Sequence, residues 1–121
     1  MEFTGDKPIY VQLADDVIRK IVRKEINPGD KLPSVREMAL QSGVNPNTVQ
    51  RTYSELERVE IVETKRGQGT FVTENVDILQ RLKESLRRDS IQAFIQEMKL
   101  LGFTIDEMID GLQEVKEDGR V

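Results

Sequence analysis

Residues 34–53 read SVREMALQSGVNPNTVQRTY, and this stretch decides the fold. Ser34 with Glu37 three residues later forms a capping box, which is typical of a helix N-terminus. Gly43 suits the left-handed backbone conformation that ends many helices. A second helix is predicted after a turn of about four residues, and the stretch therefore predicts a helix-turn-helix.

The second helix is predicted over about residues 48–59, with Asn47 as its N-cap. Val49, Tyr53 and Leu56 recur at intervals of four and three residues, so they share one apolar face. The opposite face is polar and is expected to carry no acid; it holds Asn47, Gln50, Arg51, Ser54 and Arg58.

Further elements are predicted on both sides of this unit. An amphipathic helix is expected over about residues 8–26, with Pro8 in its first turn. Two short strands at 61–64 and 70–72 enclose a turn with two glycines and two cations, which is typical of a wing. The predicted fold is mainly α with a small β-hairpin, and residues 1–74 form a winged helix-turn-helix domain.

Residues 75–121 are predicted to form a two-helix dimerisation element. The first helix ends near Gly102, and Thr104 with Glu107 forms a capping box for the second. The apolar residues change phase near Asp89, which leaves open either a bend or a change of packing partner.

A helix–helix interface explains the apolar residues of this tail better than a ligand pocket. Two helices cannot enclose a small molecule and also cover their own apolar faces, whereas a symmetric dimer buries each tail against its copy. The predicted dimerisation residues are Leu79, Leu82, Leu86, Ile91, Phe94, Ile95, Met98, Leu101, Ile105, Met108, Ile109 and Leu112.

The net charge of −4 conceals an uneven distribution. Residues 1–74 carry 11 basic and 12 acidic side chains, a balance of −1, and residues 75–121 carry 7 and 10, a balance of −3. Residues 43–54 and 64–72 contain no acid, so these two stretches are candidates for facing phosphate.

The residue types in these stretches suit DNA. The first residues of the second helix in such a unit face base edges, where asparagine and glutamine pair with adenine and arginine pairs with guanine. The Thr48 hydroxyl suits a phosphate, and Arg66 suits a narrow minor groove. The alternative is an ordinary three-helix unit, in which Asn45-Pro46-Asn47 is only turn and cap chemistry and the wing glycines only close a hairpin.

Other classes of function are disfavoured by composition. The chain has no cysteine and no histidine, so we expect no enzyme, no metal site and no cofactor. No apolar run is long enough to cross a membrane, and Met1–Lys7 lacks the apolar core of a signal peptide, so a cytoplasmic location is expected. A winged helix that binds another protein rather than DNA remains the rival function.

Four motifs resemble the GntR family of bacterial regulators, over about residues 7–73 without a gap. They are PIYVQL at 8–13, PGDKLPSVREMA at 28–39, GVNPNTVQRTY at 43–53 and GQGTFV at 67–72. The resemblance implies a winged helix-turn-helix that binds double-stranded DNA. Together with the chemistry above, it assigns DNA binding to Ser34, Arg36, Asn45, Pro46, Asn47, Thr48, Gln50, Arg51, Lys65, Arg66, Gly67, Gln68, Gly69 and Thr70.

Two departures separate the chain from many relatives: Pro46 and Asn47 stand where arginine or serine is common, and Gln50 stands where arginine is frequent. The operator of those relatives therefore cannot be transferred. The short tail resembles the YtrA subgroup, whose tail serves chiefly for dimerisation. The resemblance implies a sequence-specific transcription regulator, expected to repress from a palindromic operator as a homodimer, and it identifies no small-molecule effector.

Overall fold

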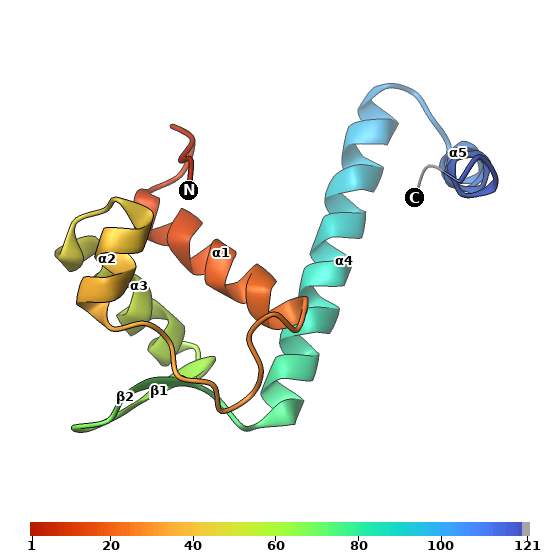
Figure 1. The fold of residues 1–121 in the computed structure, drawn as a ribbon. Helices are drawn as coiled ribbons and strands as arrows, with labels where there is room; N and C mark the ends of the chain where they lie inside the picture. Colours follow the sequence, from red (N-terminus) through yellow and green to blue (C-terminus); the bar gives the residue numbers. More distant parts are fainter. Residues whose placement is uncertain (120–121) are drawn as a thin grey trace. The chain divides into compact units, whose positions relative to one another are not determined.

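The computed structural model describes residues 1–119 and confirms a mainly α fold with one β-hairpin (Figure 1). Its elements are α1 (Ile9–Val22), α2 (Val35–Ser42), α3 (Pro46–Arg58), β1 (Val62–Lys65), β2 (Gly69–Val72), α4 (Val76–Leu100) and α5 (Ile105–Glu117). No helix among residues 1–119 has the length and apolar character needed to cross a membrane.

The chain divides into two compact units. The first is Met1–Arg81 and the second begins at Leu82, so α4 starts in the first unit and continues into the second. The predicted division after residue 74 falls just before α4 and stays a prediction. Arg120 and Val121, the last residues of the predicted tail, lie outside the described residues.

Helix α1 is shorter than predicted. Pro8 is the N-cap rather than a residue of the first turn, and the helix ends at Val22 instead of residue 26. Lys24 adopts a left-handed conformation with φ of 66°, and the Glu25 backbone N–H donates back to the Lys20 carbonyl over 2.9 Å. This reversal ends the helix one turn early, because a left-handed residue cannot continue it.

The helix-turn-helix forms at residues 34–58 with the predicted capping box. The Ser34 hydroxyl accepts a hydrogen bond from the Glu37 N–H over 3.1 Å, and the Glu37 carboxylate accepts one from the Ser34 N–H over 3.0 Å. Gly43 ends α2 with φ of 68°, as predicted.

The start of α3 corrects one prediction. Asn45, not Asn47, is the N-cap, because its side-chain oxygen accepts the Asn47 backbone N–H over 2.8 Å. Pro46 then occupies the first helical position, where its missing N–H leaves no hydrogen bond unmade. The helix begins two residues earlier than the sequence predicts.

The core of the first unit lies among α1, α3 and the hairpin. Leu13, Val17, Val49, Leu56, Val62 and Val72 are all at most 2% exposed. Both α1 and α2 pack on α3, which holds the second helix of the helix-turn-helix against a scaffold rather than leaving it on a loop.

Residues 30–32, which the sequence did not predict as a strand, also pair with strand β2 of the hairpin. Strand β1 begins and ends one residue later than predicted, while β2 begins one residue earlier and ends at Val72 as predicted. The Leu32 N–H donates to the Thr70 carbonyl, and the Val72 N–H donates to the Asp30 carbonyl, each over 2.8 Å. The segment that enters α2 is therefore joined to the base of the wing.

The second unit consists of most of α4 with α5. Helix α4 is continuous to Leu100, so the phase change near Asp89 marks no break in the helix. Gly102 turns the chain with φ of 90°, and the Thr104 hydroxyl accepts the Glu107 N–H over 3.1 Å as the capping box predicts. Of the apolar residues described in this unit, only Met108 is buried.

Candidate nucleic-acid interface

The first turns of α3 present polar side chains to solvent. Asn47 and Gln50 are exposed, and among residues 1–119 the Gln50 side chain makes only a long hydrogen bond, to the Ser54 hydroxyl at 3.5 Å. The Asn45 oxygen is already occupied as the helix cap, which leaves its amide N–H groups for a ligand. Asn47 and Gln50 therefore have both donors and acceptors available, as base reading requires.

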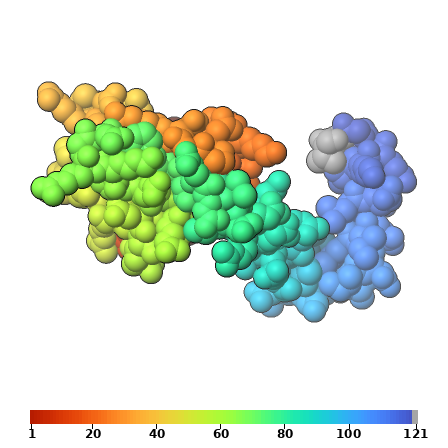
Figure 2. Space-filling view, turned by 90° about the horizontal axis from the view of Figure 1, so that it is seen from below, coloured from red at the N-terminus to blue at the C-terminus, as the bar shows by residue number. Residues whose placement is uncertain are grey.

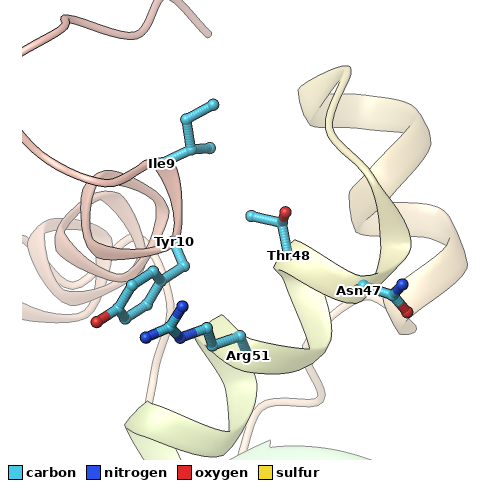
Figure 3. Close-up of a pocket in the computed structure, with 5 residues that line it drawn as sticks. All are labelled: Ile9, Tyr10, Asn47, Thr48 and Arg51. Atoms are coloured by element: carbon cyan, nitrogen blue, oxygen red, sulfur yellow. The ribbon is translucent and has the colours of Figure 1, made fainter.

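Arg51 turns toward α1 instead. Its guanidinium carbon lies 3.8 Å from the centroid of the Tyr10 ring, which is a cation–π contact. Figure 3 shows the two side chains meeting at the edge of a hollow of about 360 Å³ between the helices. The hollow is lined by Ile9, Tyr10, Asn47, Thr48 and Arg51, so it brings together three of the predicted DNA-binding residues.

A buried hydroxyl joins the two helices at this hollow. Thr52 is 0% exposed, and its hydroxyl lies 3.1 Å from the Tyr10 carbonyl oxygen and 3.0 Å from the Thr48 carbonyl oxygen. When its one proton is donated to the Tyr10 carbonyl, the hydroxyl links the first turn of α1 to α3; the Thr48 carbonyl is the alternative acceptor within α3 itself. Sequence reasoning missed Thr52, because a threonine among polar helix residues carries no sign of burial.

A second buried side chain holds the recognition helix to the segment before α2. The Tyr53 hydroxyl donates to the Pro33 carbonyl over 2.6 Å, and the residue is only 4% exposed. Burial, and secondarily the charge of Glu37, raises the pKa of Tyr53 to about 12. The phenol therefore stays protonated as a hydrogen-bond donor at neutral pH.

The wing carries cations at an exposed tip. The hairpin tip, in green, projects from the surface of the first unit (Figure 2). Arg66, Gly67 and Gln68 form the three-residue loop, and all are exposed. Lys65 lies 4.8 Å from the centroid of the Phe71 ring and 4.0 Å from Glu63, so its charge is partly offset.

A groove separates the wing from the start of α2. Its volume is about 530 Å³, and its lining includes Lys31, Ser34, Glu37 and the wing residues Thr64, Lys65, Arg66, Gly67, Gln68, Gly69 and Thr70. The hydrogen bond from the Ser34 N–H lowers the pKa of Glu37, so the groove holds one carboxylate among three cations. Ser34 thus lies with the wing rather than with the start of α3.

Lys31 is a cation that sequence reasoning missed. A Cβ on Gly69 would lie 2.7 Å from the Lys31 Cε, so the lysine stem crosses the wing where only glycine leaves room. Asp30 precedes Lys31, so a search of the sequence for stretches without acids passes over this lysine. Its position becomes evident only once residues 29–32 are known to pair with β2.

Two further arginines of the helix-turn-helix differ in whether an acid pairs with them. Arg36, in the first turn of α2, is exposed, and none of the ion pairs within residues 1–119 involves it. Arg58 instead pairs with Glu55 at 2.7 Å, and Glu57 accepts a hydrogen bond from the Thr64 hydroxyl. The acid-free surface of α3 therefore ends at Ser54, which corrects the prediction that it extends to Arg58.

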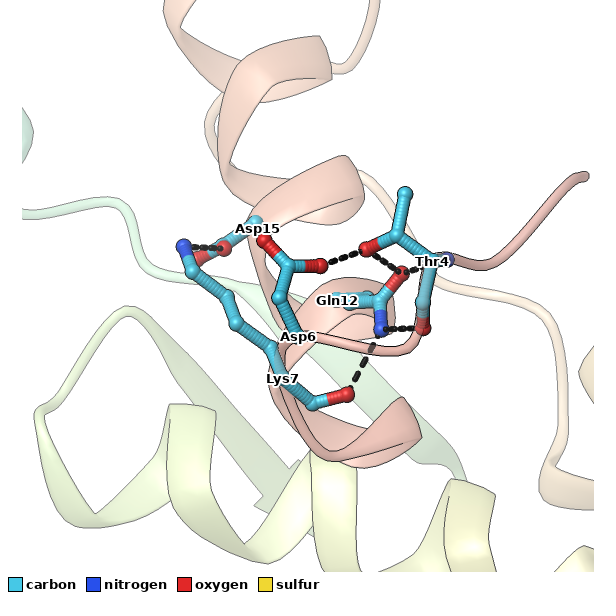
Figure 4. Close-up of polar contacts among 5 residues, drawn as sticks. All are labelled: Thr4, Asp6, Lys7, Gln12 and Asp15. Atoms are coloured by element: carbon cyan, nitrogen blue, oxygen red, sulfur yellow. Dashed lines mark hydrogen bonds and ion pairs between the residues drawn. The ribbon is translucent and has the colours of Figure 1, made fainter.

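Residues 4–7, which precede α1, are held to this helix by polar contacts (Figure 4). The Gln12 amide donates to the carbonyls of Lys7 and Thr4 over 2.7 and 2.9 Å, and its oxygen accepts the Thr4 N–H. The Thr4 hydroxyl donates to Asp6 and lowers the pKa of that carboxyl, while Lys7 pairs with Asp15 at 3.4 Å. These bonds fix the chain entering the first turn of α1.

All but one of the predicted dimerisation residues are at least partly open to solvent. Leu79, Leu82, Leu86, Phe94, Ile95 and Met98 are half-buried, Met108 is buried, and Ile91, Leu101, Ile105, Ile109 and Leu112 are exposed. Within the second unit, Phe94 and Met108 contribute to an apolar hollow of about 380 Å³. The prediction omitted Leu100 and Phe103, which are 89% and 42% exposed, because both fall at the end of the helical pattern.

The sequence pattern of the bacterial regulatory proteins of the gntR family matches residues 9–72. The chain is 55% identical over 118 residues to the HTH-type transcriptional regulator YhcF of Bacillus subtilis, covering 98% of each chain. It is 36% identical to the HTH-type transcriptional repressor YtrA of the same organism, covering 92% of this chain and 86% of that one. These relatives are transcription regulators, which confirms the prediction that the chain is not an enzyme.

Solved structures of transcription regulators are also similar to this chain. A GntR family transcriptional regulator from Listeria monocytogenes has a TM-score of 0.89 and 39% identity, covering 93% of this chain and 99% of that one. The AraR DNA-binding domain, solved in complex with operator ORR3, has a TM-score of 0.55 and 26% identity, covering 60% and 88%. The first match confirms the predicted winged helix-turn-helix.

Proposed function

The chain belongs to the GntR family of bacterial regulatory proteins, and we propose that it is a repressor that binds a palindromic operator as a homodimer. Members of this family regulate transcription by binding DNA through the winged helix-turn-helix. The proposal adds three properties to that activity: repression, a palindromic site and a dimer.

One observation carries the proposal. The first turns of α3 expose Asn47 and Gln50 on a surface that contains no acid before Glu55, and the wing tip exposes Arg66 in the same unit. Such a helix reads base edges in the major groove while a wing contacts the backbone or minor groove nearby. An acidic chain that keeps acids out of the first turns of α3 and out of the tip of the wing is adapted to a polyanion.

The second unit supports the homodimer. It buries only Met108 among its described apolar residues and leaves side chains such as Leu100 and Ile109 in water. Apolar surface of this kind on a small helical unit marks an interaction site, and a second copy of the chain is the occupant that closes the assembly symmetrically. A two-fold dimer presents two recognition helices, so its site has two-fold symmetry.

Repression follows from occupation of the operator. A dimer bound across a promoter excludes polymerase without any further activity. The likeness to a relative named as a repressor supports this direction. Since chromosomal DNA is the partner, we place the protein in the bacterial cytoplasm.

The test is selection of bound sequences from a random duplex pool with the purified protein, followed by light scattering of the free protein and the complex. We expect a palindrome whose half-sites lie about 10–10.5 base pairs apart, or a multiple of that, bound by a dimer. An enriched site without two-fold symmetry contradicts the palindrome, and a monomeric protein on that site contradicts the dimer. Placing the site over a promoter in a reporter strain then tests repression.

The rival function is an adaptor that binds another protein through the same fold. Phosphate contacts release counterions, so the affinity of a DNA-binding protein falls steeply with salt. An adaptor would enrich no sequence and would show no such dependence.

A further inference from the structure

We infer that Tyr10 positions Arg51 to hold a phosphate of the DNA backbone, an inference that rests on the DNA-binding function proposed above. The carbon of the Arg51 guanidinium lies 3.8 Å from the centroid of the Tyr10 ring, and Figure 3 shows the two side chains meeting. A free arginine side chain samples many rotamers, and stacking on an aromatic face selects among them before any ligand binds.

The ring is itself held in place relative to α3. The buried Thr52 hydroxyl lies 3.1 Å from the Tyr10 carbonyl oxygen, so the backbone at the ring is joined to the helix that carries Arg51. Tyr10 is half-buried in the first turn of α1. The stack therefore joins two packed helices and does not depend on a loop.

Stacking leaves the hydrogen-bonding groups of Arg51 available. The five guanidinium N–H groups lie in the plane of the group, so a ring over its face blocks none of them. None of the ion pairs within residues 1–119 involves Arg51, and the nearest acid in sequence, Glu55, pairs with Arg58 at 2.7 Å. The planar fork matches two oxygens of a phosphate.

The direction of Arg51 favours phosphate over a base. Gln50 and Arg51 are one residue apart, so they leave α3 about 100° apart around the helix axis. With Gln50 directed to base edges, Arg51 faces the hollow at the side of the helix, whose lining includes Ile9 and Thr48 and no acid. A helix in the major groove has sugar–phosphate backbone along its sides, and this placement replaces the guanine contact expected for Arg51 from sequence.

The test compares Arg51→Ala, Tyr10→Leu and the double variant with wild type, with Tyr10→Phe as the control that keeps the aromatic face. The probes are the selected palindrome and a duplex of the same composition with scrambled half-sites, titrated over a range of salt. We expect Arg51→Ala to weaken both complexes by the same factor, on the order of tenfold per half-site, and to reduce the salt slope by about one per half-site.

Tyr10→Leu should lose a large part of the affinity that Arg51→Ala loses. The double variant should bind little more weakly than Arg51→Ala alone, and Tyr10→Phe should bind almost like wild type. Loss confined to the palindrome would show that Arg51 reads a base, and additive losses would show that the stack does not act through Arg51; either result overturns the inference. If Tyr10→Leu fails to fold, Arg51→Lys decides, since lysine keeps the charge but not the planar group: weakened binding supports the inference and wild-type binding overturns it. If the wild-type chain binds neither duplex, the DNA-binding function proposed above is itself contradicted.

Discussion

The Tyr53 hydroxyl lies 2.6 Å from the Pro33 carbonyl oxygen and donates a hydrogen bond to it. This bond connects the middle of α3 to the residue that precedes Ser34, the N-cap of α2, so it ties the recognition helix to the segment that enters α2. The bond is partly buried: Tyr53 is only 4% exposed, and Pro33 is half-buried.

Tyr53→Phe should lower the free energy of unfolding by about 1–2 kcal/mol, because it leaves the Pro33 carbonyl without its partner while keeping the ring in the core. Urea denaturation at neutral pH measures the change. Tyr10→Phe is the matched control, since no hydrogen bond of the Tyr10 hydroxyl is present among residues 1–119, and it should be nearly neutral. Equal stability of wild type and Tyr53→Phe would contradict the assignment.

The difference in stability between wild type and Tyr53→Phe should depend on pH in alkaline solution. The pKa of Tyr53 is raised to about 12 in the folded chain, and an unfolded tyrosine titrates near 10. Between these values the unfolded chain releases a proton that the native chain keeps, so this contribution to stability is full below about pH 10 and is lost as the pH rises toward 12. The stability of wild type minus that of Tyr53→Phe, measured by denaturation from neutral pH to about 11, should therefore shrink above pH 10; a constant difference would contradict the raised pKa.

Gly69→Ala should distort the wing. The residue has φ of 126°, which side chains rarely adopt, and the added Cβ would lie 2.7 Å from the Lys31 Cε. The lysine can move away, so the backbone strain dominates and should cost about 1–3 kcal/mol. Gly67→Ala, with φ of 78° and open space around its Cβ, should cost less. Thermal unfolding ranks the two variants, and an equal or smaller loss for Gly69→Ala would contradict this account.

Arg36→Ala and Arg66→Ala should each weaken DNA binding without lowering thermal stability, since both side chains are exposed in the first unit. We expect a loss of about 1–3 kcal/mol for a base contact and a uniform loss across sequences for a phosphate contact. Arg23→Ala, an exposed arginine paired with Glu25 at 3.1 Å, is the control and should bind like wild type. Unchanged affinity in both test variants would overturn the docking of α2 and the wing on DNA.

Phe94→Asp should abolish the proposed homodimer, because it places an unpaired carboxylate in the apolar hollow of the second unit. Gln92→Asp adds a charge to the same helix at an exposed polar position and should remain dimeric. Light scattering of the free proteins measures both masses. A dimeric Phe94→Asp variant would place the interface elsewhere on the chain.

The sequence alone determined the elements that depend on short spacings. Ser34 with Glu37 and Thr104 with Glu107 form capping boxes as predicted, because a helix N-terminus is completed by residues three apart. Gly43 ends α2 because the left-handed backbone conformation at this position favours glycine, which the sequence shows directly. Helical periodicity and turn residues are local properties, and they suffice for a winged helix-turn-helix and for a family.

Tertiary structure decided what lies between elements. Thr52 reaches the Tyr10 carbonyl across 42 residues, Tyr53 reaches Pro33 across 20, and the stack of Arg51 on Tyr10 depends on how α1 meets α3. No spacing in the chain encodes these distances, because they follow from the packing of whole helices and not from their periodicity. The sequence therefore identified the class of DNA-binding surface, while only packing decided that Arg51 faces α1 and that Lys31 crosses the wing.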